Sequence, residues 1–219
     1  MNIGIMPAFF ENISFFLKAA IVTVYLSLVS LTIATLIGIV LGVVSVVGGK
    51  LLKAFVLAYV YVLRGLPILV LLFVFYYTLP AFRIYIPSVL AAIAGLSLWT
   101  GAYMTEIFRG AILALPRGQI DAGNSLGMDV ITLMRQVVLP QSLKYAIPPS
   151  INMTVRLIKG TSVVSIINIW ELTYAGRQVT ETTLAPFQVF GGIAIIYFLF
   201  CYSLSYLGAV LEKRYTYIH

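Results

Sequence analysis

Five charged side chains interrupt otherwise apolar stretches of this 219-residue sequence, and they are the first candidates for chemistry. They are Arg64, Glu106, Arg109, Arg156 and Lys159. Where such a stretch crosses a bilayer, each charge costs roughly 2.5–3.5 kcal/mol on insertion scales, so it usually faces a cavity or a partner. These positions are therefore candidates for a polar pathway.

Tyr103 and Glu106 are three residues apart, which places them on the same face of a helix. An aromatic ring beside a carboxylate suits an ammonium or guanidinium group. Two alternatives remain open. Arg109 is three residues further on, so Glu106 and Arg109 can simply pair, and Tyr103 can be a packing residue.

Glycines follow two of the charges. In Lys159-Gly160-Thr161-Ser162 and in Arg64-Gly65-Leu66-Pro67, glycine allows the backbone to leave helical geometry. Non-helical backbone at membrane depth is tolerated only inside protein or beside water, and transporters often hold substrates at broken helices. The predicted pathway residues are therefore Arg64, Tyr103, Glu106, Lys159, Thr161 and Ser162. The alternative is a kink required for packing, and Arg156 can instead extend to the interface.

Composition places these residues in a membrane protein. Hydrophobic residues make up 61%, charged residues 10%, and mean hydropathy is +1.04. The net charge of +7 is then a topology signal rather than a sign of nucleic-acid binding. Neither a phosphate-binding loop nor a dinucleotide fingerprint is present, His219 is the single histidine, and Cys201 is the single cysteine. We therefore expect no enzyme activity, no catalytic residues, no metal site and no cofactor in this chain.

Apolar run lengths predict an all-α integral membrane protein of about five transmembrane helices in a single domain, residues 1–219. The expected spans are 13–47, 51–79, 87–112, a polar span from Pro148-Pro149 to about 167, and 187–211. A polar external segment is expected at 169–186. Gly38 and Gly42 form a G-x-x-x-G pair, which we interpret as a packing contact.

Basic residues are unevenly divided between the two sets of loops. One set holds Lys50, Lys53, Arg109, Arg117, Arg135, Lys144, Lys213 and Arg214, and the other holds Lys18, Arg83 and Arg177. The positive-inside rule assigns the richer set to the cytoplasm. The N-terminus is then outside, the C-terminus inside, and the polar interval 116–140 cytoplasmic.

That interval carries the signals of a helix–turn–helix hairpin. Pro116 ends the preceding run, Asp121 is expected near a helix start where an acid complements the dipole, and Gly127 suits a left-handed helix end. Asp129 can cap a second helix over 130–138, which Pro140 is expected to break. The surface of the first arm carries small residues, which would allow another backbone to approach closely: Ala122, Gly123, Ser125 and Gly127. A plain surface loop is the alternative.

These residues resemble the cytoplasmic signature loop of ABC-importer permeases, E-A-A-x3-G-x9-I-x-L-P. Here it reads Asp121-Ala122-Gly123, Gly127 and Val137-Val138-Leu139-Pro140, with Asp for Glu and Gly for Ala. Further motifs are similar to the polar amino acid branch of that family. They are 64–67 (RGLP), 102–110 (AYMTEIFRG), Gly118-Gln119, 139–141 (LPQ) and 156–162 (RLIKGTS), within the stretch from Tyr61 to Glu171.

The resemblance implies a type I importer permease of the bacterial cytoplasmic membrane, for polar and particularly basic amino acids such as arginine, lysine, histidine or glutamine. It implies a second permease chain, an ABC ATPase that binds ATP and Mg, and an extracellular binding protein. The loop at about 115–142 would be the coupling helix. Its coupling residues would be Gly118, Gln119, Asp121, Ala122, Gly123, Gly127, Leu139 and Pro140. An ATP-independent transporter or channel and a non-transporting scaffold are the alternatives.

Overall fold

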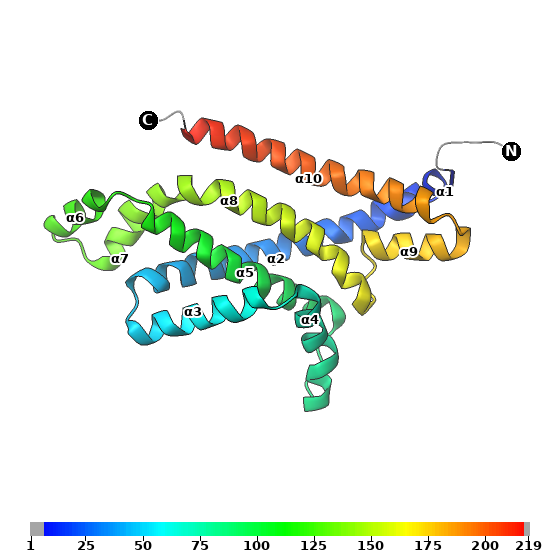
Figure 1. Cartoon of the computed structure of the whole chain (residues 1–219), viewed down its shortest axis with the longest axis horizontal. Coiled ribbons are helices and arrows are strands. Elements are labelled where there is room, and N and C mark those ends of the chain that lie inside the picture. Colours follow the sequence, from blue (N-terminus) through cyan, green and yellow to red (C-terminus); the bar gives the residue numbers. More distant parts are fainter. Residues whose placement is uncertain (1–6, 217–219) are drawn as a thin grey trace. The chain divides into compact units, whose positions relative to one another are not determined.

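The computed structural model describes residues 7–216, with side chains described through residue 213. Every regular element in this part of the chain is helical, which confirms the all-α prediction. The α-helices, drawn in Figure 1, are α1 (Pro7–Phe10), α2 (Ile13–Val47), α3 (Lys50–Gly65), α4 (Ile68–Phe73), α5 (Ser88–Leu113), α6 (Arg117–Ser125), α7 (Val130–Leu133), α8 (Leu139–Gly160), α9 (Leu172–Thr183) and α10 (Pro186–Thr216). Between them lie the π-helices η1 (Val74–Thr78) and η3 (Met134–Val138) and the 3-10 helices η2 (Leu79–Phe82) and η4 (Thr161–Ile167).

Three of these helices are long and apolar enough to cross a membrane: Ile13–Val47, Ser88–Leu113 and Pro186–Lys213. A fourth candidate, Lys50–Gly65 with Ile68–Phe82, qualifies only as a broken pair. The break at Leu66 and Pro67 was predicted from the sequence. The helix α8 is long enough but not among the apolar candidates, so its crossing stays a prediction.

The predicted breaks at prolines in and before α8 are wrong. The helix begins at Leu139 and continues through Pro140, Pro148 and Pro149. Pro140 is accommodated because it lies in the first turn of α8, where a missing N–H is tolerated. It also follows a widened π turn, in which the Leu139 N–H donates to the Met134 carbonyl. Prolines further along are tolerated in membrane helices when local adjustment satisfies the freed groups.

Contacts group the chain into two compact units. One combines the chain up to Ser30 with Ile68–Leu96 and Val155–Leu204, and the other combines Leu31–Pro67, Ser97–Thr154 and the chain from Ser205 onward. Four long helices, α2, α5, α8 and α10, each contribute residues to both units. The single-domain expectation stays a prediction.

In the first unit, the start of α2, the helix α9 and the start of α10 share a core that includes Phe16, Leu172 and Val189. The helix α9 lies within residues 169–186, which were expected to form a polar external segment. The side of the membrane on which α9 lies stays a prediction. Its N-cap residue Glu171 is wholly buried inside this unit. The carboxylate accepts hydrogen bonds from the Tyr174 N–H (2.8 Å) and the Tyr197 hydroxyl (2.9 Å). These bonds compensate for the loss of water.

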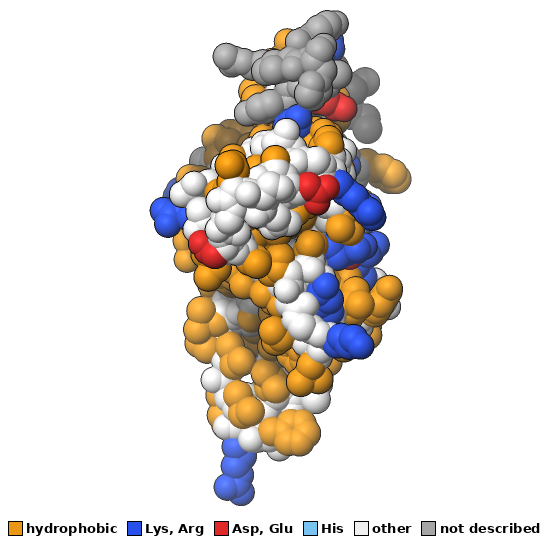
Figure 2. Space-filling view, turned by 90° about the vertical axis from the view of Figure 1, so that its left-hand side faces the viewer, with side chains coloured by type: hydrophobic (Ala, Val, Ile, Leu, Met, Phe, Trp, Pro, Cys, Tyr) orange, Lys and Arg blue, Asp and Glu red, His pale blue; other side chains and the backbone are white. Residues whose placement is uncertain are grey.

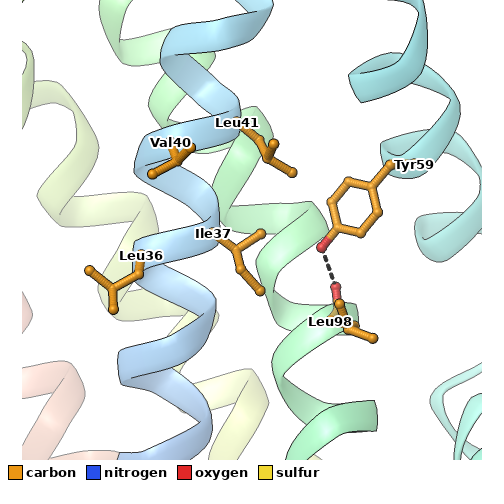
Figure 3. A pocket seen from close by; sticks show the side chains of 6 residues that line it. All are labelled: Leu36, Ile37, Val40, Leu41, Tyr59 and Leu98. Carbon is orange, nitrogen blue, oxygen red and sulfur yellow. Dashed lines mark hydrogen bonds between the residues drawn. The ribbon is translucent and has the colours of Figure 1, made fainter. Parts of the chain in front are cut away.

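The second unit packs the end of α2 against α5 through the predicted glycine pair. A Cβ at Gly38 would collide with Met104, and one at Gly42 would lie 2.8 Å from the Phe108 Cβ. The pair is therefore a packing contact within this unit, as predicted. A cavity of about 420 Å³ lies between α2, α3 and α5 (Figure 3), and the Tyr59 hydroxyl donates to the Leu98 carbonyl at 2.8 Å on its wall.

Candidate functional site

The predicted hairpin is present at the end of α5, where α6 and α7 fold back on one another (Figure 1). Gly127 ends α6 in the left-handed conformation, with φ of 73°. Its N–H donates to the Asn124 carbonyl at 3.0 Å, and the Met128 N–H reaches the Gly123 carbonyl at 3.1 Å. This pair of bonds is a Schellman motif, which satisfies the last carbonyls of the helix. The predicted stop at Gly127 is confirmed.

The second arm begins at Asp129, also as predicted. One carboxylate oxygen accepts from the Ile131 N–H (3.0 Å) and the Thr132 N–H (3.1 Å), and the other accepts from the Thr132 hydroxyl (2.5 Å). The hydrogen bond from the Thr132 side chain, helped by the backbone bonds, lowers the pKa of Asp129 below its ordinary value. The cap is therefore ionised and intact at neutral pH.

The position expected for Asp121 is wrong. The helix α6 starts at Arg117, with Pro116 as its N-cap, so its first turn holds no acid and Asp121 lies beyond it. Interaction with the helix dipole is confined to the first turn, so Asp121 is not a dipole partner. Its backbone carbonyl instead accepts the Ser125 hydroxyl at 2.9 Å.

A small core holds the two arms together. Its buried residues are Ile112, Leu115, Leu133, Met134 and Val138, from the end of α5, the residues just after it, α7 and η3, and the half-buried Ile120 of α6 packs against them. Gly123 is buried because the Leu133 side chain lies directly against it, where a Cβ would collide with Leu133 Cδ1. The small residue at this signature position thus allows contact within the hairpin itself, not contact with a separate backbone.

The other predicted coupling residues lie at the surface of the hairpin or beside it. Gly118, Gln119, Asp121, Ala122, Gly127 and Pro140 are exposed, and Leu139 is half-buried. Three large apolar side chains near the turn are also exposed: Leu126 (82%), Val130 (55%) and Ile131 (78%). Figure 2 looks at the end that carries this hairpin, where exposed hydrophobic and basic side chains lie among polar ones. Exposed apolar side chains on a capped projection suit a protein partner.

Three of the predicted pathway residues are brought together in the second unit. The Arg64 guanidinium lies 5.1 Å from the Tyr103 ring centroid, the geometry of a cation–π contact. Arg109 donates to Glu106, with 3.2 Å from Nε to each carboxylate oxygen, so the pairing that the sequence left open as an alternative is present. Both side chains of that pair remain about one third exposed, 33% for Arg109 and 30% for Glu106.

Trp99 belongs to this cluster and was missed in the sequence. Its indole N–H donates to the Leu66 carbonyl at 3.2 Å, which satisfies a group that the break between α3 and α4 leaves free. Its ring also packs on Tyr103, with centroids 4.7 Å apart. The spacing of Trp99 and Tyr103, four residues apart on one helix face, is the signal that could have identified it.

The other three predicted residues lie in the first unit, where α8 ends at Gly160 and η4 begins. The predicted interruption of the helix is therefore confirmed. Lys159 is exposed, and Ser162 is half-buried with its hydroxyl donating to the Lys159 carbonyl at 2.7 Å. Thr161 is wholly buried, and its hydroxyl donates to the Ile158 carbonyl at 2.7 Å. Both hydroxyls thus satisfy carbonyls at the end of the helix.

Long apolar helices, a broken span and a capped polar hairpin together define a multi-pass membrane permease. The chain belongs to the family of binding-protein-dependent transport system inner membrane components, whose model matches residues 34–217. Family membership confirms a permease subunit rather than an enzyme, and it implies a multi-pass inner-membrane protein that works with a binding protein and an ATPase subunit.

Similar proteins cover nearly the whole chain. A probable amino-acid ABC transporter permease protein, YckA of Bacillus subtilis (strain 168), is 32% identical over 94% of this chain and 91% of its own length. The glutamine transport system permease protein GlnP of Escherichia coli (strain K12) is 31% identical over 94% and 95%. A solved structure described as an amino acid ABC transporter with histidines superposes with a TM-score of 0.88 at 30% identity, covering 98% of this chain and 100% of that one. This likeness confirms the type I importer permease fold.

Proposed function

We propose that this chain is the transmembrane subunit of an ATP-driven importer for polar amino acids, with basic amino acids as its preferred substrates. The amino-acid transport named for its relatives supports the class of substrate. The observation that carries the preference is the partly exposed Glu106 carboxylate, one helical turn from the Tyr103 ring.

Both ends of an amino acid have suitable groups among the pathway residues. Glu106 suits an ammonium or guanidinium group, and so does the face of Tyr103, which Arg64 already contacts; Arg64 itself suits a carboxylate. Arg109 already pairs with Glu106, so a cationic substrate would have to share or replace that partner. An anionic substrate would gain nothing from Glu106, which is why we favour basic over acidic amino acids.

The hairpin is the element that we assign to energy coupling. A separate ATPase, which would bind ATP and Mg, would contact Gly118, Gln119, Asp121, Ala122, Gly127, Leu139 and Pro140 on the cytoplasmic side, while the buried Gly123 would keep the hairpin packed. Two permease chains, most simply two copies of this one, would enclose the pathway and alternate between inward-open and outward-open states. The small core and the two caps support this role, because a lever has to be rigid to transmit movement.

The proposal is tested by reconstituting the full complex, with its binding protein and ATPase, into liposomes. ATP-driven uptake of labelled arginine, lysine, histidine and glutamine is then compared in the wild type and in Glu106→Gln. We expect basic substrates to lose more uptake than glutamine does, because only they lose an opposite charge. An equal loss for all four substrates would contradict the assignment of Glu106.

Energy coupling requires its own measurement. Uptake that continues after ATP depletion would favour the alternative, an ATP-independent transporter or channel. Labelling of single-cysteine variants from either side of the membrane tests the orientation. Residues 117–139 should react from the cytoplasmic side, and reaction from the outer side would overturn the assignment of the hairpin to an ATPase.

A further inference from the structure

Arg135 lies between two apolar grooves in the second unit, next to the hairpin. It is exposed in η3, and among the described residues no hydrogen bond, ion pair or ring contact involves its side chain. Both grooves include Arg135 and Leu139 in their lining. The Arg135 guanidinium thus stands between two apolar grooves, and Arg135 is not among the coupling residues predicted from the sequence.

The first groove has a volume of about 230 Å³. Its remaining lining is apolar: Val43 and Val47 from α2, and Val130, Ile131 and Met134 from α7 and η3. The second groove, about 240 Å³, is lined by Ile39, Phe108, Pro140 and Leu143 in addition to the two shared residues. Each groove is smaller than the roughly 300–1,000 Å³ typical of pockets for compact small molecules. Two thin apolar chains on either side of one charge fit the pair better than a single compact ligand.

Both grooves lie along the last turns of α2. Ile39, Val43 and Val47 recur every four residues and so share one face over about 12 Å of helix. Val47 is the last residue of that apolar span, and the Gly48-Gly49 turn follows it. Lys50 and Lys53 follow that turn, and because basic residues gather at the cytoplasmic interface, we place the headgroup level at this end of α2.

From this geometry we propose that Arg135 and its two grooves bind an anionic phospholipid. The guanidinium holds the phosphate, and one acyl chain lies in each groove. Charge supports an anionic headgroup: Lys144 follows groove residue Leu143, and the nearby Asp129 already accepts three hydrogen bonds from its own helix. Basic pockets beside membrane helices on the cytoplasmic side are known to suit such headgroups. This inference does not depend on which solute is transported.

The test is a lipid titration of the full-length chain, purified in detergent and followed by native mass spectrometry. Dioleoyl phosphatidylglycerol should bind at concentrations at which dioleoyl phosphatidylcholine does not. Lysophosphatidylglycerol, which has one chain, should bind more weakly than the two-chain lipid because one groove stays empty. Glycerol phosphate at the same concentration should not displace the lipid. These comparisons use only the wild-type chain, so they hold even if a variant folds poorly.

Variants then test whether Arg135 provides the positive charge that binds the headgroup. Arg135→Gln should bind phosphatidylglycerol about fivefold more weakly, the effect expected of one basic residue near an anionic headgroup. Arg135→Lys should retain most of the binding. Arg117→Gln, a matched change of an exposed arginine in α6, should bind like the wild type. Equal binding by Arg135→Gln and the wild type, equal affinity for the two lipids, or displacement by glycerol phosphate would each overturn the proposal.

Discussion

The Gln141 side-chain amide donates a hydrogen bond to Gln119 Oε1 at 3.2 Å, which joins α6 to α8 across 22 residues of sequence. Both glutamines belong to motifs that the sequence singled out separately, Gly118-Gln119 and Leu139-Pro140-Gln141. Their contact gives the two motifs one physical role. It fastens the first arm of the hairpin to the helix that continues from the second arm.

Replacing Gln141 by Leu should loosen the hairpin while leaving the rest of the fold intact. A single hydrogen bond of this kind contributes about 0.5–1.5 kcal/mol, so the global effect should be small. Hydrogen exchange of the α6 amides should nevertheless become faster. Gln136→Leu, at an exposed position in η3, is the matched control and should leave that exchange unchanged. Unchanged α6 exchange in Gln141→Leu would exclude the fastening role.

Replacing Gly127 by Val should uncouple ATP hydrolysis from transport while the protein still inserts in the membrane. The residue has a positive φ, which costs most L residues roughly 1–2 kcal/mol and suits a β-branched residue least. Gly127→Asn is the matched control, because asparagine tolerates the left-handed region. Uptake and ATPase activity in liposomes check the expectation. Wild-type uptake in Gly127→Val would refute it.

Replacing Gly123 by Val should separate the two arms of the hairpin. The added side chain would occupy the space of Leu133, whose contact with Gly123 forms part of the hairpin core. Overpacking of this kind typically costs 1–3 kcal/mol. Ala122→Val, at the exposed neighbouring position, should be tolerated far better. Protease sensitivity of residues 117–139 distinguishes the two variants, and similar sensitivity would argue against the contact.

The Asp129 cap should depend on pH in one direction only. Because its pKa is lowered in the folded chain, the cap stabilises α7 fully above the ordinary aspartate value of about 3.9 and is lost as the pH falls through the lowered pKa. Protection of the Ile131 and Thr132 amides, corrected for intrinsic exchange, should be constant from about pH 5 to 8 and decrease below about pH 4. Asp129→Ala should lack that step.

Glu171 should be essential for the stability of the first unit. Glu171→Ala would leave the half-buried Tyr174 N–H without its acceptor, at a cost of about 1–3 kcal/mol, and would leave the Tyr197 hydroxyl with Thr173 as its remaining partner. Glu171→Gln keeps one acceptor oxygen and should be less destabilised. The exposed Glu181→Ala is the matched control. The unfolding temperature in detergent ranks the stability of the three variants, and equal stability of all three would contradict the role of this carboxylate.

The ends of the hairpin helices could be predicted from the sequence because each capping signal acts over a few residues. Gly127 and Asp129 end and begin helices through bonds to neighbouring backbone, so the sequence alone predicted them. The expectations for Asp121 and Pro140 failed for a related reason. A helix start at Arg117 and a π turn at Met134–Val138 are shifts of only a few residues, too small to be read from composition, yet they decide what each residue does.

The amino-acid sequence by itself determined that this chain is a helical membrane protein with a capped polar hairpin, because run length, composition and caps are local or additive properties. The resemblance of its motifs to those of ABC-importer permeases supplied the class of protein. Only the tertiary structure decided which distant residues meet. Burial of Glu171 against Tyr197, contact of Gly123 with Leu133, and the position of Trp99 at the Leu66 break depend on helices that pack from separate parts of the chain. Such contacts follow from the packing of whole side-chain surfaces, which no local pattern records.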